Sequence, residues 1–148
     1  MKVRIIFLLF ILVIGGCQSR DSKDLNDDQL RELAWNVLEE SERSTIVGSK
    51  DDIEYKDDHN SGVVTIINNA PEDVWKSAQI VYLNENQVKG ISNKLKVKNS
   101  KEIVEVNFRT LLGETSNVDY EPIKVYIDLD KGNVIGKEKG KLNIQMQF

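Results

Sequence analysis

The hydrophobic residues of this 148-residue chain begin with one unbroken apolar run and then change to periodic spacing. The run, Ile5–Ile14, contains no polar side chain and follows a basic start with Lys2 and Arg4. Ten helical residues rise only about 15 Å, roughly half of a bilayer's hydrocarbon core. The pattern therefore predicts the apolar core of a secretory signal peptide and not a membrane-spanning helix.

The next pattern repeats every three to four residues and predicts an amphipathic helix. Asn26 is a favourable N-cap, and Gln29 stands where the partner residue of a capping box belongs. We expect the helix to fade within residues 40–44 and its apolar face to pack on the protein's own sheet, although that face could instead receive a partner helix. This face consists of Leu30, Leu33, Ala34, Val37 and Leu38.

Beyond Gly48 the spacing changes to alternation, which predicts strands. The expected elements are a hairpin from Ile53–Tyr55 to Val63–Ile67, a strand over residues 78–83, another over 103–109, and a hairpin over 123–136 that turns at Gly132. Residues 112–121 read as a loop, and alternation over 142–148 favours a final strand. The expected fold is α+β, an N-terminal amphipathic helix packed on an antiparallel, mostly meander-type sheet.

Leu95 and Val97 alternate with Lys94, Lys96 and Lys98, which predicts a strand with three ammonium groups on one face. Such a ridge could contact anionic lipid headgroups or wall polymers. It could equally be the solvent face of an amphipathic strand, or an edge that lysines protect from pairing. We favour the solvent-face interpretation.

The residues Ile14-Gly15-Gly16 precede Cys17, the one cysteine of the chain, and resemble the lipobox of bacterial lipoproteins. The resemblance implies that residues 1–16 are a signal peptide and that Cys17 is lipidated on the extracytoplasmic face of the cell membrane. Residues 17–24 would then be a lipidated tether, and residues 25–148 a single α+β domain. Seven flexible residues reach about 15 Å, so partners should lie close to the membrane.

Charge and cysteine content exclude several kinds of partner and site. Without Lys2 and Arg4 the chain has 18 basic side chains against 24 acidic ones, a formal charge of −6 that argues against nucleic acid. A lipidated Cys17 also leaves no thiol for a disulfide or a metal site. We therefore predict no cofactor and no metal.

Candidate catalytic groups are few. His59 is the sole histidine, so a histidine zinc site is excluded, and it reads as a turn residue between acidic neighbours. The acidic segments around Asp57 and Asp128 both depart from the EF-hand calcium pattern. Carboxylate pairs such as Glu72 with Asp73, or Asp119 with Glu121, keep a small hydrolase open as an alternative.

Several segments together resemble small lipoproteins of Gram-positive bacilli, and the closing hairpin is similar to PepSY-like domains. The segments are Leu33–Leu38, Val104–Thr110, Pro122–Asp128 and Val134–Gly136. The resemblance implies a domain that binds or restrains partners, often peptidases, at the cell envelope. The expected function is therefore a lipid-anchored, non-catalytic binding or regulatory module for an envelope protein. The alternative is an envelope hydrolase that uses carboxylates, which would need a pocket where such groups converge.

Overall fold

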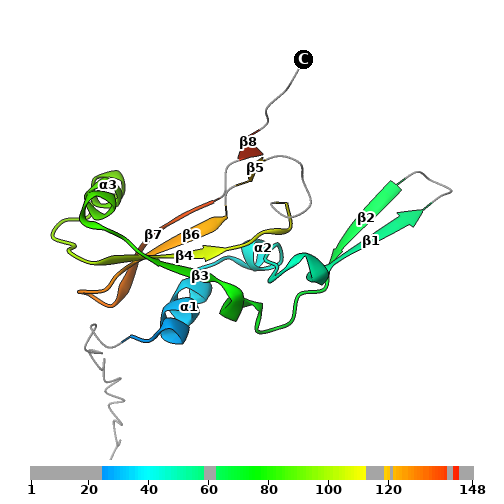
Figure 1. Cartoon of the computed structure of the whole chain (residues 1–148), viewed down its shortest axis with the longest axis horizontal. Coiled ribbons are helices and arrows are strands. Elements are labelled where there is room, and N and C mark those ends of the chain that lie inside the picture. The colour runs from blue at the N-terminus through cyan, green and yellow to red at the C-terminus, as the bar shows by residue number, and fades with distance from the viewer. Residues whose placement is uncertain (1–24, 59–62, 113–118, 121, 140–141, 144–148) are drawn as a thin grey trace, which may run out of the picture.

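The computed structural model describes residues 25–58, 63–112, 119–120, 122–139 and 142–143. Its centre is a four-stranded antiparallel sheet in the order β3-β4-β6-β7 (Figure 1). Two further two-stranded sheets pair β1 with β2 and β5 with β8. The strands and helices together confirm the predicted α+β class. The central strands are β3 (Gln79–Tyr82), β4 (Ile103–Phe108), β6 (Ile123–Asp128) and β7 (Asn133–Glu138).

One face of this sheet packs against α1 (Asp27–Asn36). The capping box is formed, with Gln29 N donating to Asn26 Oδ1 and Asn26 N donating to Gln29 Oε1, both at 3.0 Å. Leu30 and Ala34 are fully buried and share a hydrophobic cluster with the inward residues of β4 and β6. The burial of this apolar stripe fixes the helix on the sheet.

The helical segment is shorter than the sequence predicts. The first helix ends at Asn36, and a separate four-residue helix, α2 (Glu40–Arg43), follows it. The break occurs because Glu39 adopts an extended conformation and acts as the N-cap of α2. Two 3-10 turns, η2 (Lys50–Asp52) and η3 (Val74–Ser77), complete the connections on this side.

The other sheet face is partly covered by α3 (Glu85–Leu95), and this helix corrects the sequence prediction. Lys94, Lys96 and Lys98 do not form a strand face, because Lys94 lies in the last helical turn and Lys96 ends the helix with a left-handed backbone (φ 56°). The helix forms because Asn84 caps it and because one face packs on the sheet. The residues of that face are Val88, Ile91 and Leu95.

The predicted hairpins are present. β1 (Ile53–Asp58) pairs with β2 (Val63–Asn68), and β6 pairs with β7 through a turn in which Gly132 has φ 63°. The stretch predicted as a loop contains β5 (Asp119–Tyr120), which pairs with β8 (Leu142–Asn143). The rest of the predicted final strand, residues 144–148, lies outside the described residues.

Candidate functional site

The first candidate site is a projecting hairpin, which we call the arm and define as β1 and β2. It projects from the central sheet and lies at the opposite end of the molecule from α3 (Figure 1). The arm is a sheet of its own, and none of its described residues belongs to either hydrophobic cluster of the body. A two-stranded ribbon without further packing is marginally stable in water. A contact with another molecule would therefore stabilise the arm.

The strand register sorts the side chains of the arm into two faces. Tyr55 lies opposite Ile66, and Asp57 opposite Val64, so these four residues share one face. The opposite face pairs Glu54 with Ile67, Lys56 with Thr65, and Asp58 with Val63. The first face is apolar except near the tip, and we call Tyr55, Val64 and Ile66 the apolar face of the arm.

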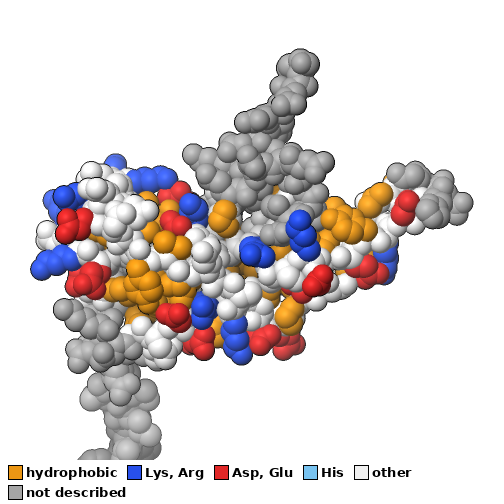
Figure 2. All heavy atoms as spheres, in the orientation of Figure 1, with side chains coloured by type: hydrophobic (Ala, Val, Ile, Leu, Met, Phe, Trp, Pro, Cys, Tyr) orange, Lys and Arg blue, Asp and Glu red, His pale blue; other side chains and the backbone are white. Residues whose placement is uncertain are grey.

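These apolar side chains are open to solvent. Tyr55 and Val64 are each 56% exposed and Ile66 is 41% exposed. Figure 2 shows hydrophobic side chains on the projecting arm. Scattered single apolar residues on a surface are ordinary, but a contiguous group on one face of a ribbon is a candidate interaction site.

The base of the arm is held firmly to the body. The Asp52 carboxylate accepts hydrogen bonds from Gly48 N at 2.6 Å and Ser49 N at 3.0 Å, and Asn69 N donates to Asp52 O at 2.7 Å. On the other strand, Asn68 Nδ2 donates to Ser44 O and Ile46 O, each at 2.9 Å. The arm thus leaves the body in a direction that its own hydrogen bonds define.

A depression of about 400 Å³ adjoins this base. It lies between α2 and the segment that follows β2, and its lining includes Trp35, Ile46, Asn68 and Pro71. Asn68 belongs to the same ribbon face as Tyr55 and Ile66 by register. The apolar face of the arm therefore continues toward a concave surface on the body.

The arm and its base are acidic. Between Lys50 and Asn69 the chain has five aspartate and glutamate residues against two lysines. An approaching surface with basic side chains would be attracted to this region, and an anionic one would be repelled.

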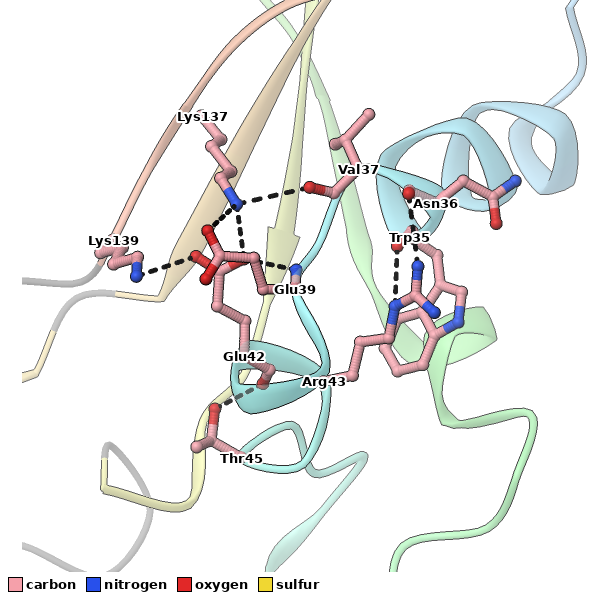
Figure 3. Close-up of polar contacts among 9 residues, drawn as sticks. All are labelled: Trp35, Asn36, Val37, Glu39, Glu42, Arg43, Thr45, Lys137 and Lys139. Atoms are coloured by element: carbon pink, nitrogen blue, oxygen red, sulfur yellow. Dashed lines mark hydrogen bonds and ion pairs between the residues drawn. The ribbon is translucent and has the colours of Figure 1, made fainter.

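A second cluster of charges lies at the corner between α1 and α2, where it joins these helices to β7 (Figure 3). Glu42 is 5% exposed and accepts hydrogen bonds from Lys137 Nζ at 2.6 Å and from Glu39 N at 2.8 Å. Lys139 Nζ forms an ion pair with the other carboxylate oxygen at 3.4 Å. The corner is closed further by Arg43, which donates to Trp35 O at 3.2 Å and lies over the Trp35 ring.

The ionisation of this corner is fixed by its own partners. Burial raises the pKa of Glu42, but the hydrogen bonds from Lys137 and the Glu39 backbone outweigh it, so the pKa is lowered overall. The hydrogen bond to Glu42 raises the pKa of Lys137. Because both carboxylate oxygens of Glu42 form ion pairs with lysines of the same chain, we interpret the cluster as a structural joint.

Among the described residues, the other candidates from the sequence do not come together as a site. Cys17 and His59 lie outside the described residues, as does Glu121. Lys94 is paired with Glu138 at 2.7 Å, and the predicted lysine ridge does not exist. Asp73 holds Lys76 at 3.2 Å in an exposed ion pair on a turn.

Asp128, in one of the acidic segments compared above with the EF-hand pattern, is the last residue of β6. Asp128 is fully buried and accepts hydrogen bonds from Ser100 Oγ at 2.5 Å and Lys131 Nζ at 2.8 Å, so its carboxylate is used to close the β6–β7 turn. Within the described ranges, no three aspartate, glutamate, histidine or cysteine side chains gather as metal ligands would. The helices among those residues are also too short or too polar to cross a bilayer.

Comparison with known proteins yields no relative: no family model, curated protein or solved structure matches this chain. The functional interpretation therefore rests on the geometry. Sequence reasoning found the hairpin but missed the exposure of its apolar face. The alternation of Tyr55, Val64 and Ile66 was the available signal, and alternation alone does not tell whether a face is covered.

Proposed function

We propose that this protein is a lipid-anchored binding module on the extracytoplasmic face of the cell membrane, and that its arm docks a membrane-proximal protein. The anchor would be Cys17, and the domain would act by binding and not by catalysis. The observation that carries the proposal is the solvent-exposed apolar face of an arm whose base is fixed to the body. The resemblance to PepSY-like domains stays a prediction and points to the same class of function.

The chemistry of the arm specifies the kind of partner. A complementary surface would offer an apolar strip for Tyr55, Val64 and Ile66, bordered by lysine or arginine side chains that face the acidic base. Burial of the exposed apolar area would supply the affinity, and the charges would supply orientation and rate of approach. A second copy of the arm, or an anionic bilayer, would place like charges together, so we favour a separate basic protein.

Site-specific photocrosslinking in living cells tests this proposal. A photoreactive residue replaces Tyr55 on the apolar face, and a matched variant carries it at Lys56 on the opposite face of the same strand. We expect a discrete protein adduct from position 55 and little from position 56. Mass spectrometry identifies the partner, which is then purified for binding measurements.

Two substitutions on neighbouring positions of β2 provide the decisive comparison. Ile66→Lys introduces a charge into the apolar face and should abolish the position-55 adduct and weaken binding to the purified partner. Thr65→Lys adds the same charge on the other face and should leave both unchanged. Equal adducts from positions 55 and 56 would contradict the docking role, as would adducts formed with lipid or with a second copy of this chain.

A further inference from the structure

The helix α3 lies at the end of the central sheet far from the arm (Figure 1). A second concave surface lies between this helix and the sheet. It is a pocket of about 450 Å³ between the helix and the polar part of the sheet face. Gly90, Ile91 and Lys94 form its helical wall, and Glu105, Tyr126 and Glu138 come from three adjacent strands. Its volume is within the range of sites for small molecules.

The floor of the pocket is a buried tyrosine between two carboxylates. Tyr126 is 2% exposed, lies directly opposite Glu105 in the strand register, and also interacts with Glu138. Burial raises the pKa of Tyr126, and the two neighbouring negative charges raise it further. The hydroxyl therefore keeps its proton at neutral pH. Two carboxylates thus face one small volume, together with the ammonium groups of Lys94 and Lys124.

Two lysines balance these carboxylates, and one of them is largely exposed. The Lys94 side chain is 55% exposed and lies 2.7 Å from Glu138 Oε1, and Lys124 Nζ is 3.8 Å from Glu105 Oε1. Ion pairs with exposed lysines contribute little stability. A ligand cation can therefore replace Lys94 at Glu138 without a large loss elsewhere.

The carboxylate of Glu138 is the acceptor that a ligand in this pocket would meet. Glu138 Oε1 is buried and receives no well-aligned hydrogen bond, although it is paired with Lys94. A ligand that brings N–H groups to Glu138 would therefore take the place of Lys94, whose Nζ lies 2.7 Å from Oε1.

Gly90 keeps the helical wall open. A glycine inside a helix is destabilising relative to alanine. At Gly136 the reason for glycine is plain, because a Cβ there would lie 2.8 Å from Leu95 Cδ1. At Gly90 a Cβ would meet no atom within 4 Å. The absence of a side chain at Gly90 therefore leaves empty space on the pocket side.

From these contacts we propose that the pocket beneath α3 binds a small organic cation, an ammonium or guanidinium group on a short apolar stem. The cationic head would lie between Glu138 and Glu105, and the stem would lie against Ile91 and the open backbone at Gly90. This site is independent of the arm.

The ionisation of the pocket favours binding over acid–base catalysis. Burial raises the pKa of Glu138, but the ammonium group of Lys94 beside it outweighs burial and lowers the pKa overall. Tyr126 shifts in the other direction, away from neutrality. Neither group is tuned toward the pKa near 7 that a general acid needs at neutral pH.

Amide NMR spectra of the full-length protein in nonionic detergent test the proposal. The probe is n-butylammonium, and n-butanol is its neutral counterpart. We expect saturable shifts at Gly90 and Tyr126 with the cation and none with the alcohol. No shift up to on the order of 10 mM cation, or equal shifts with the alcohol, would overturn the proposal.

Variants give the test its sharpest form. Glu138→Gln should weaken binding about tenfold because a charge-assisted hydrogen bond is lost. Lys94→Ala should tighten it about threefold, since the internal competitor is removed. Lys89→Ala, an exposed lysine on the same helix that does not line the pocket, should have no effect. Weaker binding in Lys94→Ala, or equal tightening in both lysine variants, would contradict the assignment.

Two further measurements complete the test. Gly90→Leu should abolish the shifts while the helix is retained, because leucine is a better helix former than glycine. Full binding by this variant would argue against the pocket. A blocked tripeptide with a central lysine measures the same chemistry on a protein side chain, and much tighter binding of this peptide would overturn the small-molecule assignment.

Discussion

The joint at Glu42 offers the clearest prediction, because one buried carboxylate connects elements that are far apart in the chain. The substitution Glu42→Gln keeps the size of the side chain and an acceptor for Glu39 N. It removes the negative charge that Lys137 contacts at 2.6 Å and Lys139 at 3.4 Å. The experiment therefore isolates the electrostatic part of the joint.

The expected loss follows from the burial and the remaining partners. A hydrogen bond to a charged group contributes about 1.5–3 kcal/mol, against about 0.5–1.5 kcal/mol for a neutral one. Lys137 keeps Glu39 as a partner at 3.6 Å and is 27% exposed, so water can offset part of the loss. We expect Glu42→Gln to lower the free energy of unfolding by about 1–2 kcal/mol at pH 7.

Urea titrations of the full-length protein, followed by tryptophan fluorescence, measure this change. Trp35 lies at the joint and packs against Phe108, so its emission reports the loss of this structure. With an m-value on the order of 2 kcal/mol/M, the midpoint should fall by about 0.5–1 M. Glu40→Gln, an exposed neighbour on α2, should shift the free energy of unfolding by less than about 0.5 kcal/mol.

The pH dependence of the stability difference between the wild type and Glu42→Gln can refute this reasoning. Because the pKa of folded Glu42 is lower than its ordinary value of 4.5, its charge stabilises the fold above that pH. This contribution is lost as the pH falls through the lowered pKa, so the gap between the wild type and Glu42→Gln should close in acid. A gap that is absent at pH 7, or that persists unchanged below the folded pKa, would show that the joint does not act electrostatically.

Two further predictions concern the anchor and the contact between α3 and β7. Cys17→Ala should move the protein out of the membrane fraction or leave it unprocessed, which fractionation and mass spectrometry detect; unchanged processing and fractionation would contradict lipidation. Gly136→Ala should destabilise the fold by about 1–3 kcal/mol, because the new methyl would meet Leu95 at 2.8 Å. Gly90→Ala, its matched control, should stabilise α3 by about 0.5–1 kcal/mol in the same melts, and a shift of the same sign in both variants would contradict the packing.

The α+β class and the hairpins could be predicted because their signals are local. The capping box at Asn26 and the turn at Gly132 depend on residues within a few positions of each other. By contrast, the pair of Glu42 and Lys137 joins residues 95 positions apart. No sequence spacing encodes that contact, since it depends on how the first helix lies across the sheet.

The helix α3 was missed although its signals were present. Asn84 and Gln87 form the same capping box as Asn26 and Gln29, and the cap is followed by apolar residues at helical spacing. The alternation of Lys94 to Lys98 is short enough to fit either a strand or the end of a helix. The burial of Val88 against Tyr126 and Ile103 favours the helix over a strand. The pocket that follows from it could not be foreseen, because it depends on that tertiary contact.

The isolation of the arm from both hydrophobic clusters has a consequence for the dynamics of the molecule. The amide protons of the β1–β2 ladder can exchange with solvent through local opening, while the central sheet exchanges only when larger units open. A bound partner would cover the apolar face of the arm with its own apolar surface. Amide hydrogen exchange should then become slower in the arm and stay unchanged in the central sheet. The arm would therefore reach its full rigidity only in the complex, and the affinity of the complex would include the free energy of that ordering.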